Sequence, residues 1–93
     1  MDQYYRNILA YQSKVLGYID DHSSPAAQAL KQEVQRLEDD VQVRKNPHSI
    51  DDRLKQVIRL VEHAGSSQAI SHHHTLELAR LAEHFREQLR KIK

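Results

Sequence analysis

The sequence predicts an all-α protein, an antiparallel up-down-up-down four-helix bundle formed by residues 1–93 as a single domain. Three observations support this prediction. Apolar residues repeat at helical spacing in four segments, and no stretch alternates with period two for long enough to form a strand. Short breaks separate the segments, which makes consecutive helices antiparallel neighbours. Two glycines and two prolines are too few for a sandwich or barrel with many tight turns.

The first two helices are expected at residues 2–21 and 25–45. Gly17 lies inside the first, where it either permits close approach of a neighbouring helix or marks an early helix end. Ser24 can cap the second helix, with Pro25 in its first position. The apolar residues of the two segments are Tyr5, Ile8, Leu9, Val15, Leu16 and Ile19, and then Leu30, Val34, Leu37 and Val41.

The third and fourth helices are expected at residues 50–64 and 71–92. Pro47 cannot continue the preceding helix, and Ser49 with Asp52 approximates a capping box. Gly65 is placed to end the third helix in the left-handed conformation, and the fourth then opens near Ser71. The apolar residues are Ile50, Leu54, Val57, Ile58, Val61 and Ala64, and then Leu78, Leu81, Ala82, Phe85, Leu89 and Ile92.

Composition excludes several functional classes. Without cysteine the chain has no disulfides, thiol nucleophile or cysteine-bound zinc. The net charge of +1 is spread evenly along the chain, which argues against nucleic-acid binding. No basic stretch followed by an apolar run opens the sequence, and no apolar run approaches the ~18 residues of a membrane helix. We therefore expect a cytoplasmic protein.

Catalytic motifs are also missing from the sequence. We find neither a Gly-x-Ser-x-Gly turn nor a glycine-rich phosphate loop. Enzymes built on helical bundles place arginine inside the bundle, whereas four arginines here fall off the apolar stripes and are expected in solvent: Arg36, Arg53, Arg59 and Arg80. We expect no enzymatic activity and no cofactor.

Histidine is abundant, with seven residues, and it suggests two hypotheses. Three consecutive rings at 72–74 cannot converge on one metal ion from a regular helix, so only His73 with Glu77 has the required spacing there. A polar first helical turn explains the triplet more simply. The segment around His63 resembles the His-x-x-Lys-Gly-Ser signature of histidine-phosphotransfer bundles, but two residues between the histidine and the glycine, including the lysine, are missing.

Three of the four tyrosines, all in the first segment, are spaced by sevens: Tyr4, Tyr11 and Tyr18. This stripe is either a partner surface, which includes a homodimer interface, or the rim of the core.

Cations gather at the end of the last helix, at Arg80, Arg86, Arg90, Lys91 and Lys93. They either stabilise the helix, since cations suit the negative end of its dipole, or form a docking surface for an acidic or membrane-proximal partner.

From residue 26 onward, the order of features carries a resemblance to a known family. The segments concerned are Lys45-Asn46-Pro47, Ile50-Asp51-Asp52-Arg53-Leu54, Ile70-Ser71 and Leu76-Glu77-Leu78. They resemble the immunity proteins, of the enterocin A immunity type, that protect lactic acid bacteria from their own pediocin-like (class IIa) bacteriocins. The third helix of that family similarly opens with an apolar-x-x-Arg-Leu pattern, and its fourth follows an apolar residue and Ser or Thr.

The resemblance implies a cytosolic four-helix bundle that acts without catalysis at the inner face of the membrane. Its implied partners are the mannose phosphotransferase permease that serves as bacteriocin receptor, or the bacteriocin itself. The family's third and fourth helices are associated with the choice of bacteriocin, so the expected binding residues are the exposed positions Arg80, His84, Arg86, Arg90 and Lys91. The alternatives are a histidine-phosphotransfer-like signalling bundle and a generic helical interaction or regulatory module.

Overall fold

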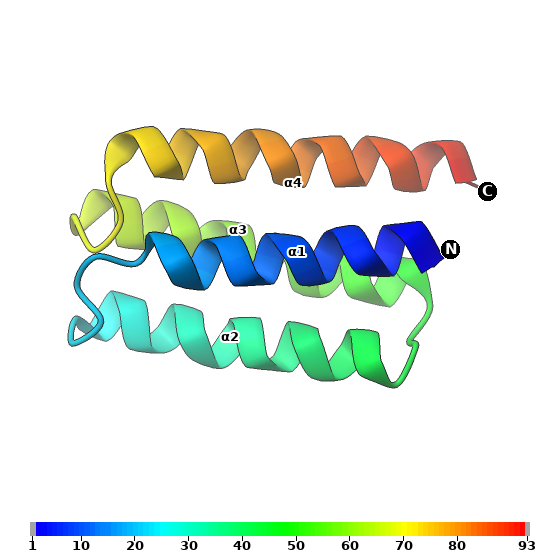
Figure 1. Cartoon of the computed structure of the whole chain (residues 1–93), viewed down its shortest axis with the longest axis horizontal. Helices are drawn as coiled ribbons and strands as arrows, with labels where there is room; N and C mark the ends of the chain where they lie inside the picture. The colour runs from blue at the N-terminus through cyan, green and yellow to red at the C-terminus, as the bar shows by residue number, and fades with distance from the viewer. Residues whose placement is uncertain (1, 93) are drawn as a thin grey trace.

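The chain folds into the predicted antiparallel four-helix bundle. A computed structural model describes residues 2–92, and the side chains of residues 2–91. Its helices are α1 (Asp2–Tyr18), α2 (Pro25–Gln42), α3 (Pro47–Ser66) and α4 (His72–Ile92). Each helix packs against the next, and α1 also packs against α4, which closes the ring (Figure 1).

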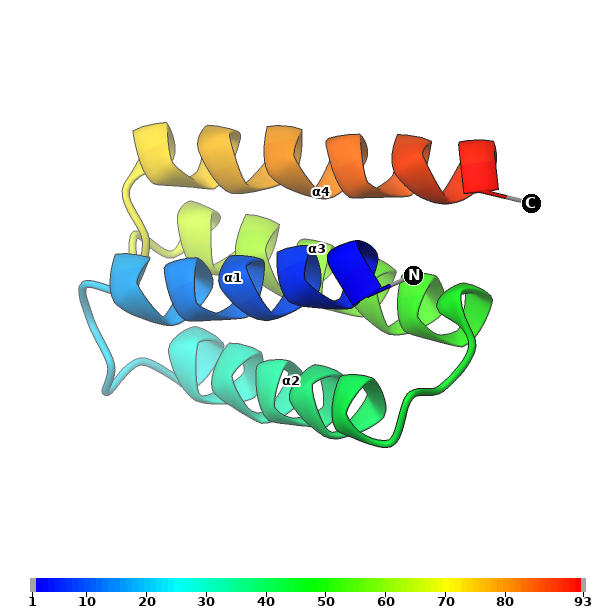
Figure 2. The same cartoon turned by 45° about the vertical axis from the view of Figure 1, so that its right-hand side comes forward.

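The two ends of the bundle hold different helix connections. Figures 1 and 2 show both chain ends beside the α2–α3 connection, and the other two connections together at the opposite end. There, Ile19 and Ile70 form an isolated antiparallel bridge, and the Asp20 N–H donates to the Ala69 carbonyl at 2.8 Å. This pairing explains why α1 ends at Tyr18 and not at the predicted residue 21, because the chain must become extended to reach the α3–α4 connection.

The apolar stripes of the four helices converge on one core. Burial removes apolar side chains from water and is the main source of the bundle's stability. Two of the heptad tyrosines, Tyr4 and Tyr11, are core residues at 3% and 2% exposure, whereas Tyr18 is half-buried. The largest fully buried side chains are Ile8, Tyr11, Val15, Leu30, Val34, Leu37, Ile50, Leu54, Val57, Val61, Ile70 and Leu78.

Three helix starts are capped by side chains. The Ser24 Oγ accepts a hydrogen bond from the Ala27 N–H at 3.0 Å, and Pro25 occupies the first turn, as predicted. Ser71 caps α4 in the same way, through the His74 N–H. The capping box predicted at Ser49 is wrong, because the Asn46 side chain accepts from the Ser49 N–H at 3.0 Å and α3 begins at Pro47, three residues before the predicted start.

The ends of α2 and α3 also differ from the prediction. Both helices finish with a non-glycine residue in the left-handed conformation, Arg44 with φ 56° and Gln68 with φ 66°. In each case the next N–H bonds back to a carbonyl five residues earlier, Lys45 to Asp40 and Ala69 to Ala64, as in a Schellman motif. α2 therefore stops at Gln42, before the predicted residue 45, and α3 runs on to Ser66, beyond the predicted residue 64.

Neither glycine ends a helix in the left-handed conformation, so that prediction for Gly65 is wrong. Gly65 lies inside α3, where a Cβ atom would come within 2.6 Å of the Thr75 Oγ1 on α4. It therefore permits a close approach of two helices. At Gly17 the space is open, with no neighbouring atom within 4 Å of a Cβ. Gly17 thus lies near the early end of α1 and has no packing role.

Candidate partner-binding surface

The predicted binding residues of α4 divide between two faces of the helix. Arg80, His84 and Lys91 are exposed, and their spacing of four and seven residues places them in one stripe. Arg90 is exposed as well, on a different side of α4. The prediction that Arg86 is exposed is wrong, because its side chain is 27% accessible and contacts α3. Lys93 lies outside the described residues.

Arg86 and Arg90 line a pocket between α3 and α4. The pocket measures about 400 Å³, and its other lining residues are His48 and Asp51 from the first two turns of α3 and Leu89 from α4. The α2–α3 connection brings the start of α3 beside the end of α4, so the pocket lies at the end of the bundle that carries both chain ends (Figure 1). Two of the five predicted binding residues therefore share one cavity.

An ion pair forms one wall of this pocket. The Arg86 Nε–H donates to the Asp51 Oδ1 at 3.2 Å, and the Lys55 ammonium lies 3.8 Å from the other oxygen. The Asp51 side chain is only 13% exposed, so Arg86 neutralises a largely buried charge. Tyr4 of α1 lies nearby. Its burial, together with the negative charge of Asp51, raises the pKa of the Tyr4 phenol to about 12.

Two buried hydroxyl groups have no hydrogen-bond partner among the described residues. They belong to Tyr4 and Tyr11. Tyr11 packs edge-on against Phe85 with ring centroids 5.6 Å apart. Tyr4 and Tyr11 are therefore core residues and do not form an exposed partner surface.

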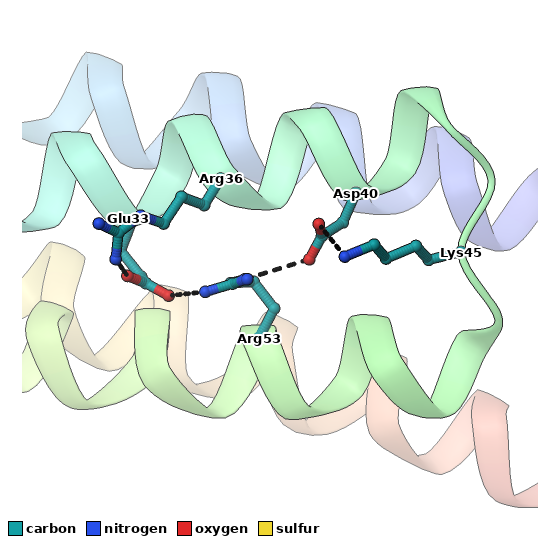
Figure 3. A network of polar contacts seen from close by, with 5 residues as sticks. All are labelled: Glu33, Arg36, Asp40, Lys45 and Arg53. Carbon is teal, nitrogen blue, oxygen red and sulfur yellow. Dashed lines mark hydrogen bonds and ion pairs between the residues drawn. The ribbon is translucent and has the colours of Figure 1, made fainter.

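A second set of charges joins α2 to α3 and corrects the prediction for Arg53. Figure 3 shows its guanidinium between two carboxylates. Arg53 Nη1 lies 2.9 Å from Glu33 Oε2, and Arg53 Nε lies 3.1 Å from Asp40 Oδ2. Arg36 and Lys45 pair with the same two carboxylates from the solvent side. Arg53 is thus partly buried at the helix interface, whereas Arg36, like the exposed Arg59 and Arg80, lies in solvent as predicted.

Asp40 favours its charged form despite its burial. Burial opposes the charge of Asp40, but hydrogen bonds from Arg53 and Lys45 outweigh it and hold the pKa of Asp40 below its usual value. The hydrogen bonds that Arg53 donates to Glu33 and Asp40 raise the pKa of Arg53. Glu33 and Asp40 lie seven residues apart on α2, which places them on the same side of the helix, next to its apolar stripe. That spacing was a sequence signal for a buried charged pair, and the sequence reasoning missed it.

Of the two residues proposed for metal binding, Glu77 takes part in a contact between α1 and α4. Glu77 Oε2 accepts hydrogen bonds from the Tyr18 hydroxyl at 2.6 Å and from Lys14 Nζ at 3.2 Å, which lower the pKa of Glu77. The Tyr18 ring stacks on His74 at 3.8 Å. His73 is exposed. Within residues 2–92, no three His, Asp or Glu side chains are arranged to hold a metal ion.

His63 is exposed in the last turn of α3. Gly65, which is part of the likeness to a phosphotransfer signature, packs against Thr75. It therefore has a structural role in this bundle. A phosphotransfer function for His63 stays a hypothesis.

Sequence reasoning also missed His48, Asp51 and Tyr4 as parts of the pocket region. Asp51 and Arg86 are 35 residues apart, and no local pattern connects them.

In the described part of the chain, every helix falls short of the length and apolar character that a membrane span requires. Comparisons of the sequence with protein-family models and curated proteins, and of the fold with solved structures, find no match.

Proposed function

We propose that this chain is a non-enzymatic binding protein that recognises a protein partner through the α3–α4 face of the bundle. The observation that supports this most is the placement of cations there. Arg80, His84 and Lys91 share an exposed stripe of α4, and Arg86 and Arg90 line the neighbouring pocket. By contrast, the most buried carboxylates, Glu33 and Asp40, are paired with arginine between α2 and α3.

In its specific form, the proposal is that the protein confers immunity to a pediocin-like bacteriocin. The sequence from residue 26 resembles that family, and the antiparallel four-helix bundle is the fold that the resemblance implies. The protein would act in the cytoplasm, at the inner face of the membrane, on the mannose phosphotransferase permease or on the bacteriocin bound to it. Attraction of cations to lipid headgroups is about 1 kcal/mol each, so a protein partner must supply most of the affinity.

Survival of a bacteriocin-sensitive strain that expresses the chain tests this proposal. We expect growth in the presence of at least one member of a class IIa panel. Arg80→Glu should reduce protection, because it reverses a charge of the α4 stripe. Arg6→Glu, the same reversal at an exposed position of α1, is the control and should protect like the parent chain. Unchanged killing by every bacteriocin of the panel, with the protein folded in the cells, would overturn the immunity proposal.

A further inference from the structure

The pocket between α3 and α4 carries more positive than negative charge. Arg86 and Arg90 line it, and Asp51 is the one acidic residue among the described residues of its wall. His48 lies in the first turn of α3, where the helix dipole also favours an anion. Leu89, at 9% exposure, provides an apolar surface beside these charges. The pocket therefore suits a ligand with a negative end and a short apolar stem.

The arginines retain capacity for such a ligand. A guanidinium has five N–H donors. Arg86 donates its Nε–H to Asp51, and its Nη1 lies 3.9 Å from a carboxylate oxygen of Glu83. Among the described residues, the carboxylate nearest to Arg90 is that of Glu83, at 4.0 Å, which exceeds a hydrogen-bond length. The Arg90 side chain is 66% exposed and can turn toward an incoming group.

We propose that this pocket binds a carboxylate side chain of an acidic protein partner, with the charged end on Arg90 and Arg86 and the methylene groups against Leu89. The inference rests on the proposed partner-binding function and names the chemistry that the partner supplies. A pocket of about 400 Å³ accommodates one such side chain and an apolar neighbour.

Two features favour a carboxylate over a phosphate group. The pocket already holds one carboxylate, because Asp51 bonds to Arg86 within it. The excess of positive charge is small, since Asp51 and Glu83 both lie close to the arginines. A site of this kind favours a planar monoanion, which matches the fork of the guanidinium, over a dianion. Asp51 then acts as an internal competitor for Arg86.

Titration of the ¹⁵N-labelled protein with a short peptide tests the inference. The probe is acetyl-Ala-Leu-Glu-Leu-Ala-amide, and its twin with Gln in place of Glu is the matched control. We expect saturable shifts of the amide signals of His48, Asp51, Leu89 and Arg90 with the Glu peptide, and none with the Gln peptide. The absence of localised shifts, or equal binding of the two peptides, would overturn the proposal. Tighter binding of inorganic phosphate would also overturn it and would assign the pocket to phosphate groups.

Two variants should change the affinity in opposite directions. Arg90→Gln, at an exposed position that leaves the fold unaffected, should weaken binding by about 1.5- to 5-fold, a range set by the energy of an exposed ion pair. Asp51→Asn should tighten binding by a similar factor, because it removes the competing carboxylate. Arg6→Gln, at an exposed position of α1 away from this pocket, should bind like the parent. Unchanged affinity in the Arg90 variant, or weaker binding in a folded Asp51 variant, would contradict the assignment.

This titration contains no bacteriocin and no permease, so its outcome is separate from the survival assay. If the parent chain gives no protection but binds the peptide, immunity is rejected and the carboxylate pocket is kept. Protection without peptide binding would reject the pocket and keep immunity.

Discussion

At the scale of single residues, the two glycines of the chain differ in the space around them. Gly65 faces Thr75 so closely that a Cβ would lie 2.6 Å from its Oγ1 and 2.9 Å from its Cγ2. The Thr75 hydroxyl is hydrogen-bonded to the Ser71 carbonyl at 2.9 Å, so it cannot move away without losing that bond. Gly17 has open space around it and an ordinary helical backbone.

We predict that alanine has opposite effects at these two positions. Gly65→Ala should lower the free energy of unfolding by about 1–3 kcal/mol, because it forces α3 and α4 apart. Gly17→Ala should raise it by about 0.5–1 kcal/mol, because alanine favours the helix at no steric cost. Urea unfolding followed by circular dichroism measures both. Adding Thr75→Ala to the Gly65 variant should restore most of the loss, whereas equal gains at both glycines would show that the two helices are not in close contact there.

At the scale of elements, the α2–α3 pair is held by its apolar stripes and by the Arg53 network. Two carboxylates, each with a side chain only 10% exposed, depend on one guanidinium that is 30% exposed (Figure 3). Removing the cation from such an arrangement is more costly than removing an exposed pair, because the carboxylates stay buried with fewer partners.

Arg53→Met is therefore predicted to lower the free energy of unfolding by about 2 kcal/mol. This loss is smaller than for a fully buried ion pair because the Arg53 side chain is partly exposed. Arg36→Met, which removes a cation that is 62% exposed from the same network, is the control and should cost less than about 1 kcal/mol. The comparison uses chemical denaturation of both variants. If Arg53→Met proves no more destabilising than the control, the network contributes little to the packing of α2 on α3.

The elements also show which parts of the structure local sequence can predict. Helical periodicity located all four helices, and Ser24 with Pro25 marked a true start, because both signals act within one or two turns. The end of α1 could not be predicted in this way, since it depends on Ile19 pairing with Ile70. The same reason applies to Gly65, whose role comes from a residue on the next helix.

The candidate site follows the same rule. Exposure of Arg80, His84, Arg90 and Lys91 was predictable from their positions off the apolar stripe of one helix. The pocket was not, because it needs the start of α3 and the end of α4 to meet. Arg53 was misjudged for a similar reason, as its partners lie 13 and 20 residues away on another helix.

At the scale of the whole molecule, acid should destabilise the bundle through two effects. The chain has 14 Lys and Arg against 13 Asp and Glu, so its net charge rises steeply from +1 as the carboxylates are protonated, and the positive charges of the folded state then repel one another. In addition, ion pairing lowers the pKa of several carboxylates, of which Asp40 is the most enclosed, between Arg53 and Lys45.

The sign of the second effect follows from linkage. The pKa of Asp40 is lower in the folded protein than its value of 3.8 in the free residue, so the folded state binds fewer protons there than the unfolded chain. Its stabilising contribution is complete above the unfolded pKa and is lost as the pH falls through the folded pKa. Glu77 contributes in the same direction, from a more exposed site.

We therefore predict that the urea midpoint falls steeply below about pH 4.5, where free carboxylates begin to protonate. In Asp40→Asn the midpoint should be lower at pH 7 and the fall below pH 4.5 shallower, because the titrating group is gone and the residual slope comes from the other carboxylates. Asp52→Asn, at a carboxylate whose side chain is 77% exposed, is the control and should keep the parent's slope. If the Asp40 and Asp52 variants give the same acid profile, the burial of charge between α2 and α3 is not what couples this fold to pH, and the general rise in net charge accounts for its acid sensitivity.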